Sequence, residues 1–180
     1  MTVAVDRFRE GMRRLAASVN ILTTSTDDGE RFGMTATAVC SVSGDPPTLL
    51  CCINRDNQTR DAVAAAGRFA VNVLAASDEP LANRFAMRMT HAERFEQGAW
   101  AMHELGLPVL ETAAAWFACQ VVTQVEVGSH TIFFGEVADV ASRGSHVLPL
   151  LYANGGYGKF FDAQPTLNEL MWTPDWQVNN

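Results

Sequence analysis

The strongest constraint on the fold is a long run of alternating residues from position 116 to 140. Its apolar side chains alternate with polar ones, which is typical of a strand with one buried and one exposed face. The polar members of its first half are Gln120, Gln124 and Glu126. Gly128 and Ser129 interrupt the run, and the apolar segment HTIFFGEVADV follows them. The sequence therefore predicts a long antiparallel hairpin.

Shorter elements precede this hairpin. Strands are expected in SVNILTTST, in the stretch from Gly33 to Pro47, in TLLCCIN, which is apolar enough to be buried on both faces, and in FAVNVLA. Helices are expected at 6–16, with Phe8, Met12 and Leu15 on one face, in the alanine-rich segment before Gly67, and from Ser77 to about Met87. Residues 90–113 have no clean period and are expected to form a covering or functional loop. With about six antiparallel strands and short helices, the chain is predicted to be mainly β and barrel-shaped.

Length and composition bound the organisation. A chain of 180 residues is expected to form one domain, 1–180, and its 48% hydrophobic residues indicate a buried interface in a homodimer. The aromatic segment 161–180, which contains Met171, Trp172 and Trp176, is expected to pack on the barrel or on the dimer partner.

Charge and patterning argue against several classes of partner. The net charge is −7, so nucleic acid is not expected as a partner. Charged residues are scattered through the first 20 positions, and no apolar run reaches the length of a membrane helix. We therefore expect a cytoplasmic protein with no membrane partner.

Cysteine and histidine usage does not predict a metal site. The four cysteines have no C-x-x-C spacing and are interpreted as reduced core thiols. The four histidines are dispersed along the chain, without a spacing typical of metal ligands. No metal is therefore expected.

The stretch from Gly33 to Pro47 contains a row of hydroxyls. If it forms one strand, Thr35, Thr37, Ser41 and Ser43 share one face, and Met34, Ala36, Ala38, Cys40 and Val42 share the other. The hydroxyls could line a cradle for a planar ligand, or they could simply cover a solvated strand face. The sequence leaves both interpretations open.

Three further segments could belong to a binding site. NRDNQTRD, residues 54–61, places amides, a hydroxyl and two guanidiniums at the start of a helix, which suits either a phosphate or an ordinary helix cap. His130 opens a strand at the expected rim of the barrel, where it is either a site residue or a surface histidine. YANGGYGKF, residues 152–160, has the glycines of a mobile loop, with Tyr157 available to cover a flat ligand.

Taken in order, RRLAASVNILTT, GMTATAVCSVSGDPPTLLCCIN, FAVNVLA, GSHTIFFGEV and PLLYANGGYG resemble the short flavin reductase components of two-component flavin-dependent monooxygenases. The resemblance runs from about Phe8 to Phe160. It implies a six-stranded, antiparallel Greek-key split barrel of the FMN-binding type, which dimerises with flavin sites near the interface.

The resemblance also implies a set of site residues. The strand from Gly33 to Ser43 would lie along the flavin, the segment from Asn54 to Arg60 would hold its phosphate, and His130 would be the catalytic residue, beside the nicotinamide. The cofactor-binding set is Met34, Thr35, Ala36, Thr37, Ser41, Val42, Ser43, Cys52, Asn54, Arg55, Asn57, Thr59, Phe85 and Tyr157. Many relatives have Gly-Asp-His where this chain has Gly128-Ser129-His130, so the role of that acid in orienting the histidine is open here.

The expected activity is NAD(P)H:flavin oxidoreduction, with NADH favoured as the reductant and FMN or FAD as the flavin. The reduced flavin would be supplied to a separate oxygenase component. One alternative is a flavin-binding or electron-transfer protein of the same fold with tightly bound FMN. Another is a fixed flavin that reduces a different substrate, such as a corrinoid or metal complex.

Overall fold

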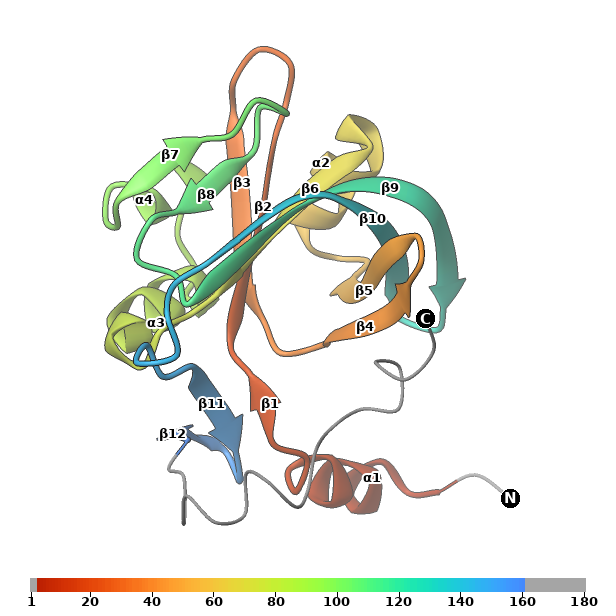
Figure 1. Cartoon of the computed structure of the whole chain (residues 1–180). Helices are drawn as coiled ribbons and strands as arrows, with labels where there is room; N and C mark the ends of the chain where they lie inside the picture. Colours follow the sequence, from red (N-terminus) through yellow and green to blue (C-terminus); the bar gives the residue numbers. More distant parts are fainter. Residues whose placement is uncertain (1–2, 161–180) are drawn as a thin grey trace, which may run out of the picture.

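A computed structural model describes residues 3–160 (Figure 1). Its main sheet has seven antiparallel strands in the order β3-β2-β6-β9-β10-β5-β4. These strands are β2 Asn20–Ser25, β3 Arg31–Ala36, β4 Val39–Gly44, β5 Pro47–Asn54, β6 Arg68–Val73, β9 Ala115–Val127 and β10 His130–Ser142. The prediction of a mainly β chain is confirmed, with one strand more in the main sheet than expected.

Smaller elements surround this sheet. One small sheet contains β1 Ala17–Ser18, β11 Leu150–Ala153 and β12 Gly156–Lys159, and another pairs β7 Trp100–Met102 with β8 Pro108–Leu110. The helices are α1 Val5–Met12, α2 Gln58–Ala66, α3 Glu79–Ala86 and α4 His91–Arg94, with a short 3₁₀ turn, η1, at Ala76–Asp78. No helix among residues 3–160 is long and apolar enough to cross a membrane.

The β9–β10 hairpin is confirmed, and it organises the sheet (Figure 1). β6 pairs along β9, and β5 pairs along β10, so the hairpin has a partner on each side. Two register shifts, at Phe134/Gly135 and Val137/Asp139, interrupt its ladder. Irregularities of this kind increase local twist and let a long hairpin curve into a barrel.

The core fills the concave side of the sheet. Phe69, Cys119 and Phe133 are completely buried there, together with Leu22 and Ile53. A second cluster, which includes Phe85, Phe95 and Leu110, lies under α3 and the β7–β8 hairpin. These clusters hold α3 and the segment 90–113 onto the barrel.

The stretch from Gly33 to Pro47 was predicted to form one strand, but it contains parts of two, β3 and β4. β3 and β4 are the two edges of the main sheet, and Thr37 and Ala38 carry the chain from one edge to the other. This link resets the alternation of side chains, so Val39 packs on the core whereas Cys40 and Val42 are exposed. The interpretation of Cys40 as a core thiol was therefore wrong.

Other predicted elements need smaller corrections. β5 is buried on one face, with Cys51 buried and its neighbour Cys52 only partly so, because the sheet has a single core side. α1 ends at Met12, before position 16, and residues 90–113 form α4, β7 and β8. The glycine-rich loop is a hairpin of β11 and β12, and its turn residues Asn154 and Gly155 have the positive φ that suits such a turn. The predicted packing of 161–180 lies outside the described residues.

Packing at Gly135 yields a test of the barrel. A Cβ at this position would lie 2.6 Å from Cζ of Phe69 and 2.8 Å from Cβ of Cys119, closer than real contacts allow. We expect Gly135→Ala to lower the free energy of unfolding by about 1–3 kcal/mol through overpacking. Chemical denaturation is the measurement, with Gly156→Ala as the control because no atom lies within 4 Å of its added Cβ. Unchanged stability in Gly135→Ala would contradict the packing argument. If the added methyl group clashes with Phe69, combining Gly135→Ala with Phe69→Leu should restore part of the lost free energy of unfolding.

Candidate functional site

The turn between β9 and β10 meets the end of β5. His130 lies opposite Asn54 of β5 and Val127 of β9 in the sheet register. The backbone N–H of Arg55 donates to the carbonyl of Ser129 at 2.9 Å. The structure thus brings together His130, Asn54 and Arg55, which come from separate sequence segments.

A polar cavity of about 350 Å³ opens at this junction, lined by Arg55, Asp56, Arg60, Gly128 and Ser129. Helix α2 begins beside it, and the side-chain oxygen of Asn57 accepts from the N–H of Thr59 at 2.9 Å. A half-exposed arginine next to a helix N-terminus suits an anion such as a phosphate. Asn57 is therefore the helix cap, and it directly follows Asp56, which lines the cavity.

The guanidinium of Arg60, the second arginine of this segment, is already held by other side chains. Arg60 donates from Nε to the Thr131 hydroxyl at 2.9 Å, and its two terminal nitrogens pair with Asp61 at 2.9 Å and Glu126 at 2.5 Å. Thr59 is fully buried, so its hydroxyl does not line the cavity surface. Of the two predicted phosphate-binding arginines, Arg55 is the more exposed and the less firmly held.

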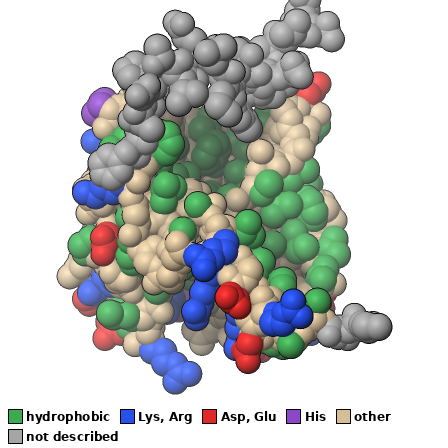
Figure 2. Space-filling view, turned by 90° about the horizontal axis from the view of Figure 1, so that it is seen from below, with side chains coloured by type: hydrophobic (Ala, Val, Ile, Leu, Met, Phe, Trp, Pro, Cys, Tyr) green, Lys and Arg blue, Asp and Glu red, His purple; other side chains and the backbone are tan. Residues whose placement is uncertain are grey.

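An apolar cavity of about 430 Å³ lies near the link between β3 and β4, lined by Met12, Arg13, Leu15, Ala17, Thr37, Ala38 and Tyr152. The N–H of Cys52 donates to the carbonyl of Ala38 at 3.0 Å, which joins this wall to β5. Arg55 is three residues further along the chain, about 10 Å for an extended segment. Figure 2 looks at the underside of the molecule, which is hollowed and has hydrophobic side chains gathered around the hollow.

The predicted hydroxyl row divides between structural and open positions. Thr35 donates to the carbonyl of Ala82 in α3 at 2.7 Å, so its hydroxyl fastens β3 to the helix. Thr37 is exposed and lines the apolar cavity. Met34 and Ala36 face the core, as the alternation predicted for this half of the stretch. The remaining predicted residues of the row, Ser41, Val42 and Ser43, lie exposed on β4, outside both cavities.

Three further predicted residues have distinct settings. Phe85 is 1% exposed and packs against Phe95 and Trp100, so it supports β3 from the core and has no surface to offer a ligand. Cys52 is partly buried, and burial raises the pKa of its thiol. The Tyr157 ring lies 5.5 Å from the Tyr152 ring, and burial raises the pKa of its phenol. Tyr152, which opens the same YANGGY segment, lines the apolar cavity, although the predicted cofactor-binding set does not include it.

Ser129 contacts the histidine that follows it. Its Oγ lies 2.9 Å from Nδ1 of His130, and both residues are exposed at the hairpin turn. A hydroxyl of this chain therefore contacts the imidazole, at the position where the family resemblance implies an acid. The contact uses Nδ1, and no residue among 3–160 hydrogen-bonds to Nε2.

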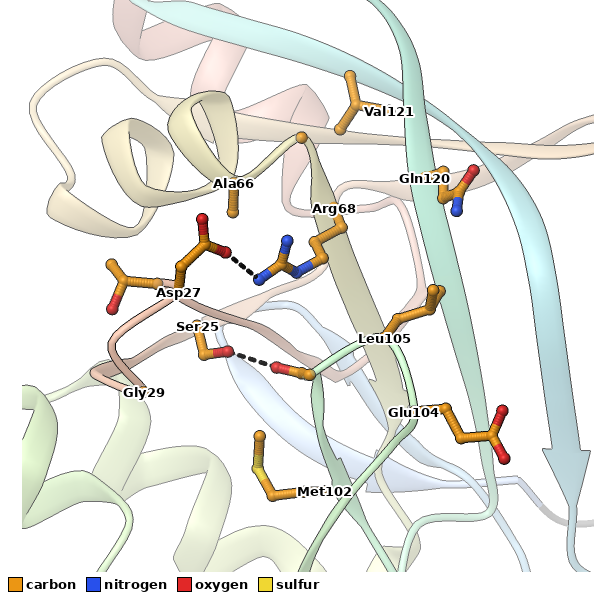
Figure 3. A pocket seen from close by; sticks show the side chains of 13 residues that line it. Ser25, Asp27, Gly29, Ala66, Arg68, Met102, Glu104, Leu105, Gln120 and Val121 are labelled. Carbon is orange, nitrogen blue, oxygen red and sulfur yellow. Dashed lines mark hydrogen bonds and ion pairs between the residues drawn. The ribbon is translucent and has the colours of Figure 1, made fainter.

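A larger cavity, of about 690 Å³, lies away from these residues (Figure 3). It is bounded by the β2–β3 turn, the end of α2 and the segment before β8, and Arg68 pairs there with Asp27 at 2.8 Å. The serine hydroxyl of Ser25 donates to the carbonyl of Gly106 across its floor. Because the cavity contains no predicted site residue and no aromatic side chain, its size alone does not make it the functional site.

Comparisons with known proteins identify the family of this chain. A family model described as flavin reductase like domain matches residues 12–160. The chain belongs to this family. An FMN reductase (NADH) RutF from Ancylobacter novellus is 44% identical over 142 residues, covering 79% of this chain and 78% of the relative.

Solved flavin reductases have the same fold. The NADH:FAD oxidoreductase SgcE6 of Streptomyces globisporus, in complex with NAD and FAD fragments, superposes with a TM-score of 0.83 at 30% identity, covering 91% of this chain and 99% of that chain. The styrene monooxygenase flavin reductase of Pseudomonas putida gives a TM-score of 0.79 at 28% identity, covering 88% and 99%. This flavin reductase is therefore an oxidoreductase with a split-barrel fold, as the sequence predicted.

Thr35 in β3 and Thr37 in the link after it allow effects on stability to be distinguished from effects on flavin binding. Thr35→Val removes a partly buried hydrogen bond, so it should lower stability by about 1 kcal/mol while leaving flavin affinity unchanged. Thr37→Val should leave stability unchanged and weaken flavin binding by a factor of several, since an uncharged hydrogen bond contributes about 1 kcal/mol. Denaturation and flavin fluorescence titration on the matched pair are the measurements. Equal flavin affinity in wild type and Thr37→Val would remove Thr37 from the site.

Proposed function

We propose that this flavin reductase uses NADH to reduce FMN, or FAD, and supplies the reduced flavin to a separate oxygenase. The observation that carries the proposal is the meeting of His130, Asn54 and Arg55 beside an apolar cavity in a chain of this family. The named relatives support the choice of flavin and reductant, and the styrene monooxygenase neighbour supports an oxygenase partner.

The residues present fit a phosphorylated flavin. The apolar cavity around Ala38 and Tyr152 suits a flat ring, and the polar cavity at Arg55 suits the phosphate. When bound together, the nicotinamide and the flavin supply the hydride donor and acceptor, so no protein nucleophile is needed. The protein must bind both rings and hold them against each other.

In this proposal each side chain has a separate task. Thr37 offers a hydroxyl to the ring edge, and Arg55 binds the phosphate. His130 positions the nicotinamide, with its ring held by Ser129 at 2.9 Å. The walls of the apolar cavity exclude water from the stacked rings, which strengthens every polar contact made there.

A homodimer is part of the proposal. Along α1 and the residues that follow it, Val5, Phe8, Met12 and Leu15 are 47–61% exposed, and two of them line the apolar cavity. A second copy that covers this face would bury it and complete the cavity wall. Phe8→Glu should therefore shift the chain toward monomer in sedimentation velocity and lower flavin affinity. A wild-type monomer at micromolar concentration would contradict this arrangement.

Steady-state assays that cross NADH or NADPH with FMN or FAD test the activity. We expect rapid NADH oxidation that depends on added free flavin. A chain that carries tightly bound FMN and does not respond to added flavin would instead be an electron-transfer or flavin-storage protein. The oxygenase partner is tested separately, by whether reduced flavin from this protein sustains its turnover.

His130→Ala should raise the KM for NADH and slow hydride transfer by about tenfold to 100-fold, because small displacements of reacting groups cost large factors in rate. Flavin affinity should be unchanged. Anaerobic single-turnover reduction and flavin titration on one preparation are the measurements. Ser129→Ala should act in the same direction with a smaller effect, because it removes only the contact that orients the ring. Loss of flavin binding with normal reduction of the remaining bound flavin would assign His130 to the flavin pocket instead.

A further inference from the structure

Glu126 pairs with the two arginines that line the polar cavity, Arg55 and Arg60. It lies on β9 opposite Thr131 of β10, and its two carboxylate oxygens face different arginines. Oε1 is 2.5 Å from Arg60, and Oε2 is 3.6 Å from Nη1 of Arg55. The side chain is 47% exposed, so it borders the solvent from which a ligand would enter.

The two arginines differ in how firmly they are held. All three nitrogens of Arg60 have partners, and its side chain is only 19% exposed. Arg55 is 50% exposed, and among residues 3–160 its guanidinium makes only long contacts, to Glu126 at 3.6 Å and to the Gly128 carbonyl at 3.5 Å. An incoming anion would therefore recruit Arg55 and leave Arg60 in place.

The charge balance of this junction opposes tight anion binding. Two arginines are matched by three acids: Asp56 lines the cavity, and Asp61 and Glu126 pair with Arg60. A phosphate dianion that approaches Arg55 meets the carboxylate of Glu126 beside the same guanidinium. The repulsion offsets part of the attraction, and water screens it only incompletely at such short range.

We propose that Glu126 sets the affinity for phosphorylated flavin by competing with the flavin phosphate for Arg55. The acid keeps the flavin exchangeable, so that the product can leave for another protein. This inference rests on the proposed function and names the residue that tunes its binding step. The ligand class is a flavin carrying a phosphate, and a flavin without one should be indifferent to Glu126.

The test compares Glu126→Gln with Glu136→Gln. The control makes the same charge change on an exposed β10 residue that pairs in register with Gln120 and Thr48, at the other end of the β5 pairing from Asn54. Dissociation constants for FMN and for riboflavin are measured by flavin fluorescence without NADH, and thermal denaturation verifies folding. We expect Glu126→Gln to lower the FMN Kd by about threefold to tenfold at low salt, with a smaller gain at high salt. Riboflavin binding and the control should be unchanged.

Three results would overturn the inference. An unchanged FMN Kd would show that Glu126 does not compete with the phosphate. Equal gains for FMN and riboflavin would place its effect elsewhere than on the phosphate, and weaker FMN binding would make Glu126 a support for Arg55. Each of these leaves NADH-dependent flavin reduction by the wild type intact. A wild type that binds no FMN would instead remove the proposed function together with the inference.

Discussion

The pairing of the β9–β10 hairpin on both of its sides is the constraint on which the rest of the structure depends. β6 pairs along β9 and β5 along β10, so the turn at Gly128 and Ser129 must lie at the end of β5. The N–H of Arg55 completes this junction with a hydrogen bond to Ser129. The site therefore requires no separate scaffold, because the sheet register itself brings His130 to Asn54.

Elements with strong local signals could be predicted from the sequence. The alternation of residues 116–140 predicted the long hairpin, and Asn57 and Gly67 marked the ends of α2, which the structure confirms with a side-chain cap and a left-handed residue. For the stretch from Gly33 to Pro47, the prediction of which side chains share a face was wrong in the second half, and the reason is physical. Alternation predicts which side chains share a face only while a strand continues, and the link at Thr37 and Ala38 ends one edge strand and begins the other.

The sequence predicted several residues of the site, but it did not predict which of them are held by other parts of the chain. His130 and Arg55 were named from their own sequence segments and from the family resemblance, and the structure brings them to one junction. The hydrogen-bond partners of the Thr35 and Arg60 side chains could not be predicted from the sequence. The Thr35 hydroxyl is taken by a carbonyl 47 positions later, and Arg60 by a carboxylate 66 positions later. Such contacts depend on tertiary packing, which no local pattern of residues encodes.

Charge and apolar contact are expected to contribute unequally to ligand affinity in this chain. The protein carries a net charge of −7, and the two arginines that line the polar cavity have the carboxylates of Asp56, Asp61 and Glu126 close by, so long-range attraction contributes little to capture of an anionic ligand. Apolar contact in the cavity around Ala38 and Tyr152 must then contribute most of the affinity. Contacts of that kind act only at short range and on a flat ring of any charge. A site built in this way binds by shape, and it can release a ligand whose phosphate it holds only weakly.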